Sequence, residues 1–150
     1  MKHVWSIICQ QSSIDFENNL LSLYGCIEEL NLVVDKDKIL QNEKMIIPAK
    51  FQLVSFWSVA DSSRDNNLDV KGEFIDPKGK VLNTFNNSFI VKSGAIRFRN
   101  RTNIQGIPVT GEGRYYLRVW QKNSHNQKFD LVAELPIDIK INYQLLEVAK

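Results

Sequence analysis

The residues whose type and spacing suggest chemistry are arginines in two segments of the second half of the chain. Arg97, Arg99 and Arg101 recur at every second position, and a period of two places them on one face of a β-strand. The segment 113–122 shows the same alternation with basic and aromatic residues. Its predicted outer face consists of Arg114, Tyr116, Arg118, Trp120 and Lys122.

If the two segments pair as neighbouring strands, these side chains form one continuous surface. The guanidinium group is a planar donor for carboxylate or phosphate, and Tyr and Trp rings offer stacking faces. Such surfaces suit protein hot spots and single-stranded nucleic acid alike. The same pattern also fits an ordinary solvated sheet face with acidic partners on neighbouring strands. The predicted partner-binding residues are Arg97, Arg99, Arg101, Arg114, Tyr116, Arg118 and Trp120.

Catalytic and metal sites have little support in the sequence. His3 and His125 lie in the first predicted strand and in a late loop, and no Cys-x-x-Cys or His-x-x-x-His motif is present, so a zinc site is not predicted. Gly111 precedes a predicted strand, whereas a phosphate loop needs a helix N-terminus. We therefore expect no catalytic residue, no metal and no cofactor.

Acidic loop residues raise the question of calcium binding. Asp61, Asp65 and Asp69 recur at every fourth position, and Asp76 lies in a second loop. Calcium requires several carboxylate oxygens. Aspartate is also favoured in turns for its hydrogen bonds to the backbone, and Arg64 would offset the charge. Calcium is therefore a minor alternative.

Two cysteines, Cys9 and Cys26, fall in neighbouring predicted strands. They could lie close enough for a disulfide, but apolar strands in a chain without an export signal favour buried, reduced thiols. Burial raises the pKa of a thiol and makes it inert. Neither cysteine is therefore predicted to be a nucleophile.

The composition limits the number of domains and the kinds of partner. The 150 residues suffice for one domain with a sizeable core, so we expect a single domain over 1–150. The net charge of +2 is too small to predict nucleic-acid binding from the total. No apolar stretch is long enough for a membrane-spanning helix, and the apolar run at 4–9 is too short for a signal peptide. We expect a cytoplasmic protein without membrane contact.

The elements that must position these residues are β-strands. Apolar side chains recur with a period of two, which is typical of half-buried strands, and turn sequences such as Asp76-Pro77-Lys78-Gly79 separate them. At most a short helical turn is expected over 35–42. Pro136 predicts that the last strand either lies at a sheet edge or bends there and switches sheets. We expect strands at 3–10, 20–29, 30–35, 49–60, 68–75, 80–85, 88–92, 95–101, 113–122 and 128–141.

Short strands between polar turns predict an all-β fold, a two-sheet antiparallel sandwich with immunoglobulin-like or related Greek-key topology. The alternation after Gly113 is typical of the late strand of immunoglobulin-like domains. The residues predicted to face the core are Leu53, Trp57, Tyr115, Leu117 and Val119.

Four stretches of the chain resemble a known family. They are VWSIIC (4–9), NLLSLYGCIEE (19–29), FQLVSFW (51–57) and the DPKG turn (76–79), with weaker support from the strand after Gly113. The chain resembles a family of small uncharacterised prokaryotic proteins, known as a domain of unknown function. The resemblance implies a compact β domain and supplies no activity and no catalytic residues.

The predicted function is a non-enzymatic binding or interaction module. It would engage a protein partner or a second copy of the chain through the arginine, tyrosine and tryptophan face or through its edge strands. The alternative is an anion-binding module for nucleic acid or another phosphate-bearing ligand. An enzyme built from loop residues ranks third, and an assembly subunit of the jelly-roll type shares the same cues.

Overall fold

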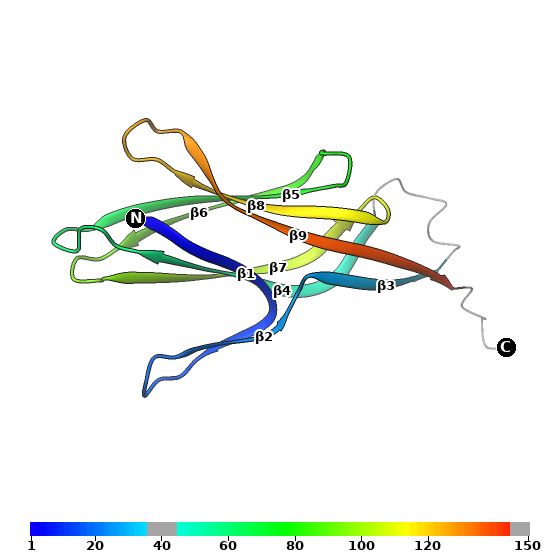
Figure 1. Ribbon diagram of the computed structural model, residues 1–150, viewed down its shortest axis with the longest axis horizontal. Coiled ribbons are helices and arrows are strands. Elements are labelled where there is room, and N and C mark those ends of the chain that lie inside the picture. The colour runs from blue at the N-terminus through cyan, green and yellow to red at the C-terminus, as the bar shows by residue number, and fades with distance from the viewer. Residues whose placement is uncertain (36–44, 145–150) are drawn as a thin grey trace.

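The computed structural model describes residues 1–35 and 45–144, and these residues form strands and the turns that join them (Figure 1). No helix among them is long and apolar enough to cross a membrane. The strands are β1 (Lys2–Ile14), β2 (Leu21–Cys26), β3 (Glu29–Asp35), β4 (Met45–Ser58), β5 (Asn66–Ile75), β6 (Val81–Val91), β7 (Arg97–Val109), β8 (Gly113–Lys122) and β9 (Phe129–Gln144).

The strands form two sheets that face each other. The first, called sheet A, has the order β2-β1-β4-β7, and the second, sheet B, has the order β3-β9-β8-β5-β6. All strand pairs are antiparallel except β3 with β9, which is parallel. The predicted two-sheet sandwich is therefore confirmed, with one parallel pair where only antiparallel pairs were expected.

The core lies between the sheets and consists of alternate side chains of the strands. Trp57 of β4 and Tyr115 of β8 are fully buried at its centre. Leu53, Leu117 and Val119 are buried as well, so the five inward positions predicted from the alternation are confirmed. Their register fixes which residues of β8 face outward, because neighbouring residues of a strand point to opposite faces.

A hydrogen-bonded corner carries the chain from sheet A to sheet B between β7 and β8. The Tyr115 hydroxyl donates to the carbonyl oxygen of Gly111 at 2.6 Å and accepts from the amides of Thr110 at 3.0 Å and Gly111 at 3.1 Å. A tyrosine bonded to the backbone just upstream at this point is typical of immunoglobulin-like sandwiches.

Several local predictions can be compared with the strands. The segments 80–85 and 88–92 are parts of one strand, β6, and the segment 95–101 begins the longer β7. The predicted turn at 76–79 is closed by a hydrogen bond from the Gly79 amide to the Asp76 carbonyl. The helical turn expected over 35–42 falls on residues that, apart from Asp35 in β3, lie outside those described.

Pro136 lies where β9 has a neighbour on one side only. It pairs with Tyr116 of β8, whereas β3 pairs with β9 from Asp138 onward. The ladder between β9 and β3 therefore begins after Pro136, which has no amide hydrogen to donate to it. β9 as a whole lies between β3 and β8 and stays in sheet B, so both alternatives predicted for this strand are wrong. Only the part of β9 that contains Pro136 lacks a neighbour on the β3 side.

Candidate functional site

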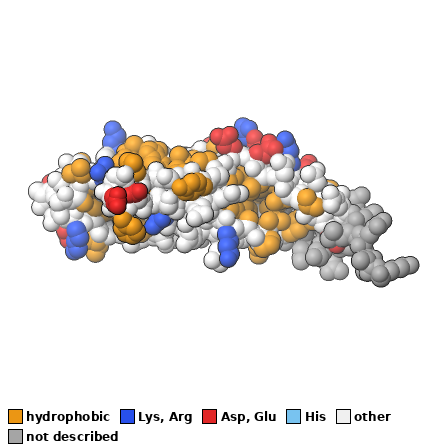
Figure 2. Space-filling model, turned by 90° about the horizontal axis from the view of Figure 1, so that it is seen from below, with side chains coloured by type: hydrophobic (Ala, Val, Ile, Leu, Met, Phe, Trp, Pro, Cys, Tyr) orange, Lys and Arg blue, Asp and Glu red, His pale blue; other side chains and the backbone are white. Residues whose placement is uncertain are grey.

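The predicted arginine surface is split between the two sheets. β7 is the edge strand of sheet A, and β8 lies inside sheet B between β9 and β5, so the two strands do not pair. The prediction of one continuous surface is wrong, because the corner at Tyr115 leads the chain across the sandwich instead of back along the same sheet. On the face seen in Figure 2, Lys and Arg side chains appear as separate spots.

The β8 arginines are paired with carboxylates of the strand beside them. Arg114 binds Asp138 with two hydrogen bonds, of 2.7 and 2.9 Å, and Arg118 binds Glu134 at 2.6 Å. Hydrogen bonding to Asp138 raises the pKa of Arg114 and lowers the pKa of Asp138. This outer face therefore resembles the ordinary solvated sheet face that the sequence left as the competing interpretation.

The aromatic residue at the end of this face is also engaged. The indole nitrogen of Trp120 donates to Glu73 of β5 at 2.9 Å, and the ammonium group of Lys71 lies 4.9 Å from the Trp120 ring centroid. Lys71 and Glu73 themselves form an ion pair at 2.8 Å. Trp120 is half-buried on the outer face, as predicted, but its hydrogen-bond donor is already occupied.

The β7 arginines have a different environment. Arg97 and Arg101 are exposed, and Arg99 donates to the backbone and side-chain oxygens of Asn19 at 3.0 and 3.1 Å. Among residues 1–35 and 45–144, no carboxylate lies within ion-pair distance of these three arginines. Arg99 is held by Asn19, so Arg97 and Arg101 are the two β7 arginines whose guanidinium groups could accept an outside anion.

The edge strand of the other sheet on the same side of the sandwich is β6. It has 11 residues, VLNTFNNSFIV, with no charged residue, no proline and no glycine. It contacts β7 through a hydrogen bond of 3.1 Å from Asn87 to Thr102. Long uncharged edges are rare in native proteins, because they present unpaired amide and carbonyl groups to other chains.

The direction of the β6 amides follows from one hydrogen bond. The Thr84 amide donates to the side chain of its neighbour Asn83 at 2.9 Å and therefore does not point into the ladder with β5. In an antiparallel strand every second amide points the same way, so the amides of Asn86 and Ser88 also point to the open edge. Sequence reasoning missed this edge because strand order is not visible in the alternation of a single strand.

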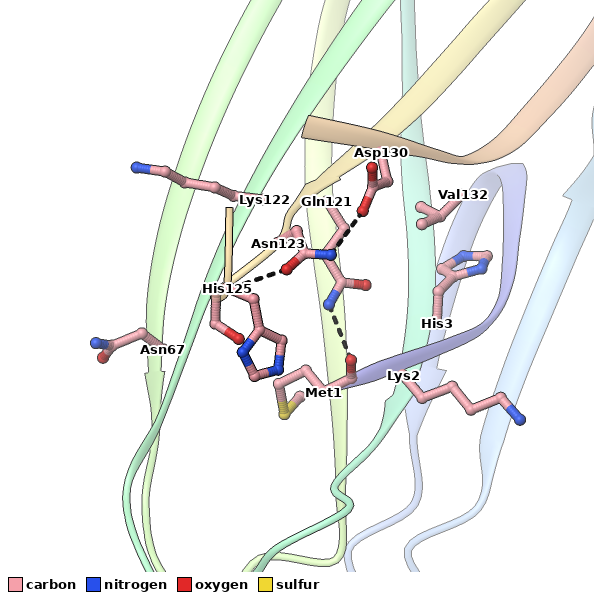
Figure 3. Close-up of a pocket in the computed structure, with 11 residues that line it drawn as sticks. Met1, Lys2, His3, Asn67, Gln121, Lys122, Asn123, His125, Asp130 and Val132 are labelled. Atoms are coloured by element: carbon pink, nitrogen blue, oxygen red, sulfur yellow. Dashed lines mark hydrogen bonds between the residues drawn. The ribbon is translucent and has the colours of Figure 1, made fainter. Parts of the chain in front are cut away.

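A surface hollow of about 500 Å³ contains both histidines of the chain (Figure 3). His3 is hydrogen-bonded to Ser6 at 2.8 Å, and burial lowers its pKa. Figure 3 shows that Lys2 and Lys122 extend in opposite directions, away from the histidine rings. The two histidines line the same hollow, which the sequence did not indicate, and the basic groups do not converge on one point.

The hydrogen bonds in this hollow connect chain segments to each other. Gln121 donates to the carbonyl oxygen of Met1 at 3.0 Å, and Asn123 donates to Asp130 at 3.1 Å. The amide of His125 donates to Asn123 at 2.8 Å. These contacts hold the β8–β9 loop and the start of β1 in place, which is a structural role.

The acidic loop residues each have a partner of their own. Asp61 pairs with Arg64 at 3.1 Å, Asp65 with Lys92 at 2.9 Å and Asp69 with Lys122 at 3.9 Å. Asp76 is buried and accepts two backbone hydrogen bonds within its turn. In the described parts of the chain, no three His, Cys, Asp or Glu side chains are placed to share a metal ion.

The two cysteines differ in exposure. Cys9 is buried, as predicted, but Cys26 is exposed, so the prediction of two buried thiols is wrong for Cys26. The reason is its place at the end of β2, which is an edge strand of sheet A. Neither cysteine forms a disulfide in the structure.

Comparison with known proteins gives structural likeness alone. No family model matches the chain, and no curated protein matches it in sequence. Among solved structures, the chain is similar to part of a β-glucuronidase from Bacteroides uniformis, with 14% identity, a TM-score of 0.45 and 66% of this chain covered. It is also similar to part of a β-glucuronidase from glycoside hydrolase family 2, with 20% identity, a TM-score of 0.43 and 64% covered.

The chain spans 14% and 11% of the lengths of those two enzymes. The likeness is therefore to a small part of each.

Proposed function

We propose that the domain is a non-enzymatic interaction module that binds an extended, acidic segment of a partner protein by strand addition to β6. The observation that carries this proposal is the 11-residue edge strand without charge, proline or glycine. In strand addition, main-chain hydrogen bonds supply affinity and alternate side chains supply specificity. The outward amides of Asn86 and Ser88 are the donors for such a ladder.

The charge of the partner is inferred from β7. Arg97 and Arg101 lie on the neighbouring edge strand, exposed and without a carboxylate partner among the described residues. A guanidinium group pairs well with carboxylates through two parallel hydrogen bonds. Phe98 and Thr102 face sheet B, so Arg97 and Arg101 lie on the outer face of sheet A. An acidic partner would reach them by continuing from the β6 edge onto that face.

A second copy of the chain fits the β6 edge less well than an acidic segment of another protein does. If two β6 strands paired about a two-fold axis at Asn86, the β7 strands, which contact β6 through the Asn87–Thr102 hydrogen bond, would come near the same axis. Two copies would then carry the same exposed arginines, Arg97 and Arg101, on one side of the dimer, and like charges repel. Charge complementarity favours a foreign acidic segment.

The experiment uses short synthetic peptides of alternating Val and Glu, with alternating Val and Lys as the charge control, and fluorescence anisotropy as the readout. We expect the Glu peptide to bind more tightly. Ser88→Pro removes an outward amide without touching the β5 ladder and should weaken binding by at least about tenfold, which corresponds to 1.4 kcal/mol. Ser88→Thr keeps the amide and should bind as the unmodified protein does.

The same measurement separates the alternatives. Equal binding by Ser88→Pro and Ser88→Thr would contradict strand addition. A dimer in size-exclusion chromatography that Ser88→Pro abolishes would favour self-association instead. Tighter binding of a single-stranded oligonucleotide, with a steep loss of affinity at higher salt, would favour the second candidate function, an anion-binding module that uses Arg97 and Arg101.

The cellular location belongs to the same proposal. We place the protein in the cytoplasm, as the sequence predicted.

A further inference from the structure

Cys9 and Cys26 lie directly opposite each other on β1 and β2. The amide of Ile27 donates to the carbonyl of Ile8 at 2.8 Å, and this bond flanks the cysteine pair, which makes it a non-hydrogen-bonded pair of the antiparallel ladder. In such pairs the Cα atoms are about 4.5 Å apart and the side chains share one face. That separation falls within the range of about 4.4–6.8 Å that a disulfide spans.

The two thiols differ in their access to solvent. Cys9 is 0% exposed, whereas Cys26 is exposed and lines a surface hollow of about 540 Å³ next to Ile27 and Arg114. A reagent can therefore reach Cys26 first. Burial, followed by the nearby Cys26 thiol, raises the pKa of Cys9, so Cys9 is mostly protonated at neutral pH.

We propose that Cys9 and Cys26 form a reversible thiol–disulfide pair, which a low-molecular-weight disulfide such as oxidised glutathione converts into a cross-strand disulfide. In the first step the Cys26 thiolate attacks one sulfur of the reagent, the reagent's S–S bond breaks, and one glutathione thiolate leaves. In the second step the Cys9 thiolate attacks the Cys26 sulfur and expels the second glutathione. Two protein thiols are oxidised, two glutathione thiols are formed, and these take up the two protons.

The bond would close the base of the β1–β2 hairpin. This hairpin extends beyond the body of the sandwich (Figure 1), and its tip carries Phe16 with 104% and Leu20 with 62% relative exposure. A crosslink at its base removes conformations from the opened hairpin. Oxidation should therefore slow proteolysis within 15–20 and raise the melting temperature by several degrees, which reduction with dithiothreitol should reverse.

The test is incubation of the full chain in glutathione redox buffers, followed by acid quenching and intact mass spectrometry. We expect the unmodified protein to lose two hydrogens and to carry no glutathione. Cys9→Ser should instead retain one glutathione on Cys26, since no second thiol can expel it. Cys26→Ser should stay unmodified, because Cys9 is buried. For the unmodified protein, the mixed disulfide should disappear faster as the pH rises, because the attacking Cys9 must be deprotonated.

Three results would overturn the proposal. They are a stable mixed disulfide at Cys26 in the unmodified protein, a disulfide found only between two chains on non-reducing gels, and glutathione attached to Cys9 in Cys26→Ser. Each is measured with the folded protein, and circular dichroism of the Ser variants checks that they keep the fold. Cys9 and Cys26 lie far from β6 in the sheet order, so this outcome is independent of the peptide-binding experiment.

Discussion

β7 and β8 follow each other in the chain and carry the same pattern of alternating arginines, yet their arginines have different surroundings. On β8, inside sheet B, Arg114 and Arg118 face carboxylates of β9 at 2.7 and 2.6 Å. On β7, at the edge of sheet A, Arg97 and Arg101 have no such partner among the described residues. A strand inside a sheet has neighbours on both sides that can neutralise its charges, whereas an edge strand has only one.

The same sequence pattern therefore has different surroundings according to the place of its strand in the sheets. The β8 arginines pair with carboxylates of the same sheet, whereas Arg97 and Arg101 of β7 are exposed without a carboxylate partner among the described residues. Substitution of the β8 arginines should therefore lower the free energy of unfolding, whereas substitution of the β7 arginines should leave it nearly unchanged. Stability measurements test this difference.

The largest effect on stability is expected for a substitution on the inward face of β8. Leu117→Ala should lower the free energy of unfolding by about 2–5 kcal/mol, because it leaves a cavity in a well-packed core. Gln105→Ala, on the outward face of β7, should change it by less than about 0.5 kcal/mol. Urea denaturation measures both. A loss below about 0.5 kcal/mol for Leu117→Ala would mean that the outward and inward faces are exchanged.

A smaller effect is expected when charge is reversed on the outward faces. Arg118→Glu would place a third carboxylate between Glu134 and Glu73, its neighbours on β9 and β5, and should cost about 1–2 kcal/mol. Arg101→Glu has no acidic neighbour and should cost less than about 0.5 kcal/mol. Urea denaturation at low salt measures the difference, and added salt should reduce it. Equal losses in both variants would contradict the idea that the two strands differ in the surroundings of their arginines.

The smallest effect on stability is expected for the ion pair between Arg114 and Asp138, and it should depend on pH. Arg114 lowers the pKa of Asp138, chiefly by hydrogen bonding, so Asp138 contributes stability above its unfolded pKa of about 3.9. That contribution is lost as the pH falls through the lowered folded pKa. The stability gap between the unmodified protein and Arg114→Gln should therefore be full near pH 6 and close below about pH 4.

The matched variant on the edge strand is Arg101→Gln. Arg101 pairs with no described carboxylate, so the stability curve of Arg101→Gln should run parallel to that of the unmodified protein at every pH. Thermal unfolding monitored by circular dichroism across the acidic range measures both variants. A gap for Arg114→Gln that stays constant in acid would show that the ion pair with Asp138 does not stabilise the fold.

The sequence predicts what depends on neighbours along the chain. Alternation identified the buried faces at Leu53 and Leu117, and the proline and glycine of 76–79 identified a turn, because a period of two and turn chemistry are local properties. The location of β8 between acidic strands was not predictable, since it depends on pairing with residues such as Glu73 and Asp138 that are distant in sequence.

One signal in the sequence could have separated β7 from β8. The alternation after Gly113 already indicated the late strand of an immunoglobulin-like domain, and Tyr115 stands two residues into it. In that fold the tyrosine marks the corner where the chain leaves one sheet for the other. With that information, the preceding strand would have been placed in the opposite sheet.

The parallel pairing of β3 with β9 has a consequence for biosynthesis. The four strands of sheet A are complete once residue 109 has been made, whereas β3 has to wait for its partner, which begins at Asp138 in the ladder. The two partners are more than 100 residues apart, and at roughly 5–20 residues per second the ribosome needs about 5–20 s to bridge that distance. For the last part of this time, the roughly 2–7 s between residues 109 and 144, the complete sheet A presents its apolar inner face before β8 and β9 exist to cover it.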